Sequence, residues 1–162
     1  MSLTIFQLLD LKKGFSLPLW VAGAAKSALK KLLGSSFQNY ELIKIPDETR
    51  LIKIAVHSAA LIQGNSHAMG ITYAKSDLAL DLTQNLEIWT IASLEKNLIK
   101  NVTQKNQLNI IAGYGVGIDQ NTSKICISLF AKEVLFENLL DIIPASMAAV
   151  PLPVIVNTSL SV

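Results

Sequence analysis

The alternation of apolar and polar positions predicts two helices and five strands. The first helix is predicted over residues 19–33, because Pro18 suits a helix start and Gly34 suits a helix stop. The second helix is predicted over residues 127–140, with Glu133 and Glu137 on its polar face. Alternating or β-branched runs predict strands over residues 40–45, 50–62, 68–74, 86–93 and 108–112.

No regular strand–helix–strand alternation persists along the chain, which argues against a doubly wound parallel sheet. The order of the elements predicts an α+β fold instead, with helices packed on one face of a mostly antiparallel or mixed sheet. Residues 1–143 are expected to form this domain, and residues 144–162 an apolar, proline-containing C-terminal tail. Because residues 142–162 carry no charge, we expect that tail to leave an unpaired edge and to self-associate through residues 145–162.

Composition narrows the class of protein. The 162 residues are 51% apolar and 16% charged, against a usual charged share of about 25%. A net charge of +2 with scattered lysines argues against a nucleic-acid partner, and Lys30-Lys31 is interpreted as solvated charge at a helix end. Prolines interrupt the uncharged C-terminal stretch, which argues against a membrane helix. No secretory signal is expected, so a cytoplasmic location is predicted.

Cysteine and histidine are sparse in this chain. Cys126, the sole cysteine, excludes an intramolecular disulfide and indicates a reducing compartment. It lies in an apolar run and is predicted to be a buried packing residue. His57 and His67 lack short-range ligand spacing, so no metal site is predicted, and His57 is interpreted as a core or edge histidine.

The segment Gly113-Tyr114-Gly115-Val116-Gly117 directly follows the predicted strand 108–112. Glycines that alternate after a strand allow the backbone to turn sharply and to approach a ligand closely. Ile118 stands where the third glycine of a dinucleotide fingerprint should be, so that motif is absent. Two interpretations remain: a binding loop that uses Gly113, Gly115 and Gly117, or a bulge or hairpin turn between strands.

Acidic residues in the loop 75–83 are the other candidates for chemistry. Asp77 and Asp81 could act as acid, base or ligand anchor at a loop mouth. Turn and capping carboxylates have the same spacing, and that alternative stays open. Neither a serine–histidine–acid triad nor a helical two-histidine metal motif can be assembled, so the catalytic residues are unknown.

Four segments in this order resemble the CbiD-type cobalt-precorrin-5B C1-methyltransferases of anaerobic cobalamin biosynthesis. They are Gly14-Phe15-Ser16-Leu17-Pro18, Ala22-Gly23-Ala24-Ala25-Lys26, Asp81-Leu82-Thr83 and Gly113-Tyr114-Gly115-Val116-Gly117. The resemblance covers roughly residues 14–143. It implies transfer of a methyl group from S-adenosylmethionine to C-1 of a cobalt-containing corrinoid.

The same resemblance assigns provisional roles to residues. Gly113, Gly115 and Gly117 would approach cofactor or substrate, Asp81 and Thr83 would line the cleft, and the alanine face of the first helix would lie nearby. The resemblance also implies a chain about twice as long, and Ser16-Leu17 replaces a Thr-Thr pair. A truncated or split enzyme is therefore expected, with a non-catalytic tetrapyrrole-binding or structural module as the alternative.

Overall fold

The computed structural model describes residues 16–75, 84–94, 108–143 and 154–161, the last of these as backbone. The described helices are α2 (Leu17–Leu32) and α3 (Leu129–Leu140). The described strands are β1 (Tyr40–Lys44), β2 (Leu51–Ala55), β3 (Ser58–Ile62), β4 (His67–Tyr73), β5 (Glu87–Leu94), β6 (Leu108–Ala112) and β7 (Val154–Ser161).

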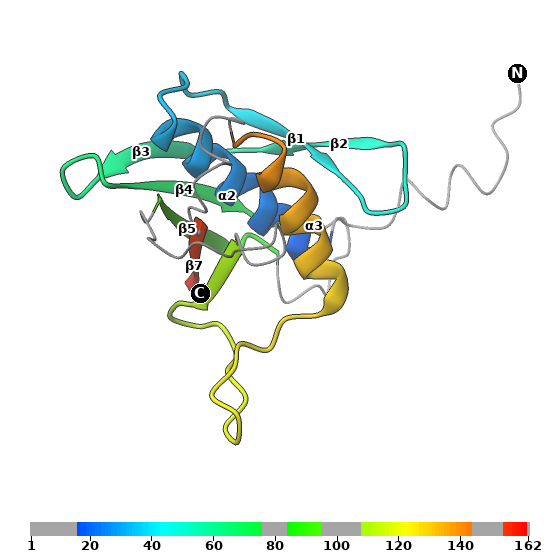
Figure 1. Ribbon diagram of the computed structural model, residues 1–162. Coiled ribbons are helices and arrows are strands. Elements are labelled where there is room, and N and C mark those ends of the chain that lie inside the picture. The colour runs from blue at the N-terminus through cyan, green and yellow to red at the C-terminus, as the bar shows by residue number, and fades with distance from the viewer. Residues whose placement is uncertain (1–15, 76–83, 95–107, 144–153, 162) are drawn as a thin grey trace, which may run out of the picture.

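These strands form two sheets. Strands β1 and β2 make an antiparallel hairpin, and a five-stranded sheet has the order β3-β4-β5-β7-β6. Its pairs are antiparallel except for β6 and β7, which run parallel. Helices α2 and α3 lie side by side on one side of this sheet (Figure 1). The prediction of an α+β fold, with helices on one face of a mixed sheet, is confirmed.

Helix α2 spans Leu17–Leu32, which agrees with the predicted 19–33 to within two residues at its start and one at its end. Pro18 lies in the first turn, and Gly34 adopts a φ of 88° immediately after the helix. The N–H of Gly34 donates to the Lys31 carbonyl, and the N–H of Ser35 donates to the Lys30 carbonyl. This pair of bonds satisfies carbonyl groups that the end of a helix would otherwise leave unpaired, and glycine tolerates the conformation that it requires.

Small residues allow α2 to lie directly on the sheets. A Cβ on Gly70 in β4 would come within 2.1 Å of the Ala24 carbonyl oxygen, and one on Gly23 within 2.5 Å of Ile54 Cγ2. Ala24 and Ala28 are fully buried in the same contact. The small-residue face of α2 therefore packs on strands β2 and β4, because any larger side chain would separate the two layers.

Polar contacts attach both helices to β1. Lys30 Nζ lies 2.6 Å from the carboxylate of Glu41, a residue only 3% exposed. The interpretation of Lys30 as a solvated charge is therefore wrong, because its ammonium group neutralises a buried carboxylate. Lys26 Nζ donates to the Leu42 carbonyl at 2.7 Å, and burial lowers the pKa of Lys26 despite the opposing effect of Glu41.

Helix α3 is attached to β1 through Asn138, which is 1% exposed. Its Oδ1 accepts from the Lys44 N–H at 2.8 Å, and its Nδ2 donates to the Lys44 carbonyl at 2.9 Å and to the Val134 carbonyl at 2.8 Å. The side-chain amide thus satisfies both backbone groups of Lys44. The Lys44 ammonium and the Asp141 carboxylate form an ion pair beside it, which raises the pKa of Lys44 chiefly through their hydrogen bond.

Three of the predicted elements differ from the structure. The expected strand 50–62 is two strands, because the chain changes partner between them: β2 pairs with β1, and the His57 N–H donates to Ile71 as β3 begins its pairing with β4. The second helix begins at Leu129 instead of residue 127, because Ser128 is its N-cap. Pairing and capping set these boundaries, and hydrophobic pattern does not report them.

The third difference is the C-terminal segment. Residues 154–161 form strand β7, which lies between β5 and β6 and pairs with both. The expectation that this segment has an unpaired edge is wrong, so the argument for self-association through it loses its premise. In the part of the chain that the structure describes, no helix has the length and apolar character needed to cross a membrane.

Candidate functional site

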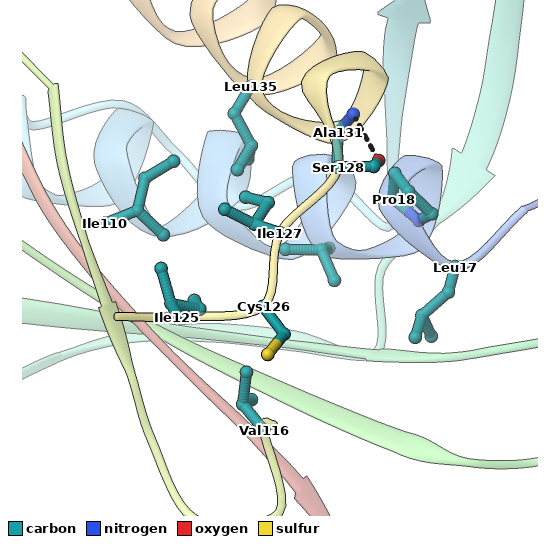
Figure 2. Close-up of a pocket in the computed structure, with 11 residues that line it drawn as sticks. Leu17, Pro18, Ile110, Val116, Ile125, Cys126, Ile127, Ser128, Ala131 and Leu135 are labelled. Atoms are coloured by element: carbon teal, nitrogen blue, oxygen red, sulfur yellow. Dashed lines mark hydrogen bonds between the residues drawn. The ribbon is translucent and has the colours of Figure 1, made fainter. Parts of the chain in front are cut away.

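A cavity of about 310 Å³ opens where the beginnings of both helices meet the chain that follows β6. Among the described residues, its lining is almost entirely apolar, and Ser128 carries the one polar side chain other than the thiol of Cys126 (Figure 2). The residues that line it are Leu17, Pro18, Val21, Ile110, Val116, Ile125, Cys126, Ile127, Ser128, Ala131 and Leu135. Two parts of the chain that are distant in the sequence, residues 17–21 and residues 110–135, therefore converge on one site.

Residues 113–127, which we call the hairpin arm, connect β6 to α3. The arm extends away from the sheets and helices (Figure 1). Ile118 and Ile125 form a β-bridge across it, and the Cys126 N–H donates to the Gly117 carbonyl at 2.9 Å. These cross-links hold Val116 on one side of the arm and Ile125 on the other against the cavity.

The tip of the hairpin arm is organised by Asp119. Its Oδ1 accepts from the N–H groups of Asn121 and Thr122, at 3.0 and 2.7 Å, and from the Thr122 hydroxyl at 2.9 Å. These bonds, those from Thr122 first, hold the pKa of the Asp119 carboxyl below its ordinary value of 3.8. The carboxylate therefore fixes a tight polar turn, outside the apolar cavity.

The glycine segment forms the first part of this arm, as a turn that directly follows β6. Gly115 has a φ of 78°, a conformation that glycine adopts without strain, and the Val116 N–H donates to the Gly113 carbonyl at 3.3 Å. A Cβ on Gly117 would meet Cys126 Cβ at 3.6 Å, an ordinary contact. The turn interpretation thus accounts for the conformation of Gly115. A binding role for the three glycines stays a prediction, and within the segment Val116 is the residue that lines the cavity.

The start of α3 forms the opposite wall. Ser128 has extended backbone angles, and its hydroxyl accepts from the Ala131 N–H at 3.1 Å. This cap lies two residues after Cys126, so that the helix begins at Leu129 and places Ala131 and Leu135, one helical turn apart, on the cavity side. The Ser128 hydroxyl is therefore already engaged in the cap and remains at the rim of the cavity (Figure 2).

None of the other predicted site residues is among the described residues that line this cavity. Asp77, Asp81 and Thr83 lie outside the described residues. The alanine face of α2 was expected near the cleft, but it packs on the sheets, and the first turn of α2 lines the cavity instead. His57 is exposed and stacks edge to face on Tyr73, with ring centroids 5.1 Å apart.

Cys126 corrects another prediction. It is exposed rather than buried, since it lies near the end of the hairpin arm, in irregular chain outside the described helices and sheets. Its sulfur points toward Val116 across the cavity (Figure 2). Among the residues that the structure describes, no group of three histidine, cysteine or acidic side chains could hold a metal ion.

Sequence reasoning missed most of the cavity wall. Ile110, Ile125 and Leu135 are ordinary core-type residues, and only tertiary contact brings them together. A partial signal did exist, because Leu17 and Pro18 belong to the first segment of the family resemblance and Val116 to the last. The structure brings these two segments to the same cavity.

A two-layer α+β domain, with an apolar cavity where its two helices begin, is the class of protein that the described residues define. The CbiD family model matches residues 7–160, and the chain belongs to the CbiD family. A cobalt-precorrin-5B C(1)-methyltransferase from Prochlorococcus marinus strain MIT 9312 is 70% identical over 134 residues, which are 83% of this chain and 36% of that protein. The corresponding protein of strain MIT 9215 is 71% identical over the same length.

A solved structure supports the fold. The cobalamin biosynthesis protein CbiD from Archaeoglobus fulgidus superimposes with a TM-score of 0.59 at 16% sequence identity, covering 91% of this chain and 43% of that one. The matched part of the chain spans about a third of the length of these curated relatives.

Proposed function

We propose that this chain forms part of the substrate cleft of a cobalt-precorrin-5B C1-methyltransferase, which transfers a methyl group from S-adenosylmethionine to C-1 of the corrinoid. The names of the Prochlorococcus relatives support the reaction class. Because the chain spans 36% of such a relative, we assign the complete activity to the full-length family protein. To this chain we assign one part of the substrate-binding site.

One observation carries the proposal: two segments of the family resemblance converge on the same cavity. Leu17 and Pro18 come from the segment that opens α2, and Val116 comes from the glycine segment, about a hundred residues later in the chain. Apolar walls of this kind exclude water and bind a flat, largely apolar ligand surface by contact. A cavity of about 310 Å³ accommodates only an apolar part of the edge of a corrinoid macrocycle, with the carboxylate side chains of the corrinoid left outside it, because burying them here would leave their charges unpaired.

The same cavity does not fit a whole molecule of S-adenosylmethionine. That methyl donor carries an ammonium, a carboxylate and a sulfonium group, and no charged side chain lines the described cavity. S-adenosylmethionine supplies an electrophilic methyl group when bound. The described residues account for binding and orienting an apolar part of a ligand, and for excluding water around it.

The alternative, a non-catalytic tetrapyrrole-binding or structural module, also has an observation in its favour. The described lining includes no histidine, carboxylate or lysine that could move a proton. A part of a methyltransferase and a non-catalytic tetrapyrrole-binding module would both bind a corrinoid, whereas a purely structural module would not. Only the part of a methyltransferase predicts methyl transfer once the rest of the family protein is present.

Filling the cavity tests the proposed site. Val116→Trp places an indole where the ligand edge would lie, and we expect it to weaken binding of cobyrinic acid to the purified chain at least about tenfold. Leu61→Trp is the matched control, because Leu61 is an exposed residue on β3, outside the cavity. Gly115→Val, a more obvious variant, strains a backbone with a φ of 78° and would confound binding with stability.

Isothermal titration calorimetry measures the affinity, and circular dichroism shows that both variants keep the fold. Equal affinities of wild type, Val116→Trp and Leu61→Trp would remove the cavity from the proposed function. Transfer of a labelled methyl group is measured separately. We expect the chain alone to give no turnover, because a part of the family protein lacks the walls that enclose the reaction. Turnover by the chain alone would show that the described part is sufficient.

A further inference from the structure

Exposed apolar side chains are concentrated on the hairpin arm and on the first turn of α3. Of the ten large hydrophobic residues that are exposed in the described part of the chain, five lie between positions 111 and 130. The four outside β6 are Tyr114, Ile118, Leu129 and Phe130, with exposed fractions of 86%, 52%, 72% and 39%. We call these four residues the arm surface.

The arm surface belongs to a well-organised structure. The Ile118–Ile125 bridge, the Asp119 turn and the bond from Cys126 to Gly117 cross-link the hairpin arm. The Ser128 cap then fixes the start of α3, so that Leu129 and Phe130 are the first residues of a regular helix. A fixed array of large apolar groups in water is typical of a surface that binds another protein segment, because burying it releases about 25 cal/mol per Å².

The polarity of the arm is divided along its length. Its tip carries polar residues from Asp119 to Lys124, whereas Val116 and Ile125 at its stem face the cavity and Tyr114 and Ile118 are exposed. A hairpin arm that only met solvent would carry polar groups along its exposed stem as well. The pattern indicates a stem that is covered and a tip that remains in water.

We propose that the occupant of the arm surface is the part of the CbiD-family polypeptide that this chain does not span. The family match includes the arm, since it extends over residues 7–160, while the chain spans only 36% of the relative from strain MIT 9312. The remaining length of that relative is polypeptide that can cover an exposed apolar surface of the matched part. The arm surface offers it exposed apolar contacts beside a cavity that still has an open side. This inference rests on family membership and is independent of the reaction proposed above.

A chimera tests the proposal in a continuous chain. This chain replaces its matched 134-residue portion in the relative from strain MIT 9312, and amide hydrogen exchange is compared between the chimera and the chain alone. We expect exchange in peptides from 111–130 to slow at least about tenfold in the chimera, with peptides from 37–51 unchanged. Unchanged exchange over 111–130 in the chimera would overturn the proposal.

Two triple variants separate this surface from exposed apolar residues in general. The arm variant is Tyr114→Ser, Ile118→Ser and Leu129→Ser, and the control variant is Phe37→Ser, Leu42→Ser and Leu51→Ser, whose parent residues are 43%, 43% and 51% exposed. The arm variant should lower the melting temperature of the chimera by several degrees more than that of the chain alone. The control variant should shift both proteins equally.

Analytical ultracentrifugation of the chain alone tests the competing occupant, a second copy of this chain. We expect a monomer, or an association that the arm variant leaves intact. A dimer that the arm variant abolishes, together with equal effects of the two variants on the chimera, would assign the arm surface to self-association and overturn the proposal.

Discussion

Replacing Asn138 should separate helix α3 from the edge of β1. The variant Asn138→Leu keeps the number and branching of the side-chain heavy atoms but removes one acceptor and one donor, which satisfy the N–H and the carbonyl of Lys44 at 2.8 and 2.9 Å. Asn138 is 1% exposed, so its leucine replacement leaves these backbone groups facing an apolar side chain. Each unsatisfied buried group costs about 1–3 kcal/mol.

The expected loss follows from these contacts. The Val134 carbonyl keeps its partner within the helix, so only the two groups of Lys44 count toward the loss. Because the side chain of Lys44 is half exposed, water can reach part of this edge, and we expect a total of about 2–4 kcal/mol. For a chain of this size that corresponds to a fall in melting temperature of roughly 5–15 °C.

Urea unfolding followed by circular dichroism measures this loss directly. Asn138→Asp keeps the shape and the acceptor but cannot donate to the Lys44 carbonyl, so it should also be destabilised. Glu133→Ala is the control, since Glu133 is exposed on the same helix, and it should change stability by less than about 0.5 kcal/mol. A loss below about 1 kcal/mol for Asn138→Leu would refute the reasoning, because it would mean that water satisfies Lys44.

Other positions give shorter tests. Gly70→Ala should lower the free energy of unfolding by several kcal/mol, since its Cβ would lie 2.1 Å from the Ala24 carbonyl oxygen. Gly117→Ala, whose Cβ would lie 3.6 Å from its nearest neighbour, should lower it by less than about 1 kcal/mol, and equal losses in urea unfolding would contradict the packing argument. The pKa of the Asp119 carboxyl is lowered in the folded chain, so its carboxylate should stabilise the turn at any pH above the ordinary pKa of 3.8. This stabilisation should be lost only as the pH falls through the lower folded pKa. A titration midpoint at or above pH 3.8 in the NMR shift of the Thr122 amide would exclude this. Deleting residues 154–161 should unfold the five-stranded sheet, because β7 pairs with β5 and β6; a cooperative melt of the shortened chain would show that the strand is dispensable.

Local sequence signals predicted the elements whose boundaries depend on local chemistry. Proline and glycine delimit α2 within two residues of the prediction, and β6 spans residues 108–112 as expected. The same signals failed where a strand boundary depends on which strand the chain pairs with. The strand expected over 50–62 divides at the point where pairing passes from β1 to β4, and no residue in that stretch encodes the change.

The candidate site shows the same division. The motif order led to the family, and the glycine segment led to the hairpin arm, since both are properties of the linear sequence. The exposure of Cys126 was predicted wrongly, because an apolar run does not report whether a second layer covers it. The assignment of Asp81 and Thr83 to the cleft stays a prediction, since both lie outside the described residues.

By itself, the sequence determined the α+β class, the caps of α2 and membership of the CbiD family, because turn chemistry, periodicity and motif order act over short distances. Tertiary structure alone decided that β7 lies between β5 and β6, and that the beginnings of α2 and α3 share a cavity with Val116. Both arrangements join residues far apart in the chain. Their stability comes from pairing and burial between such segments, which no local pattern of side chains specifies.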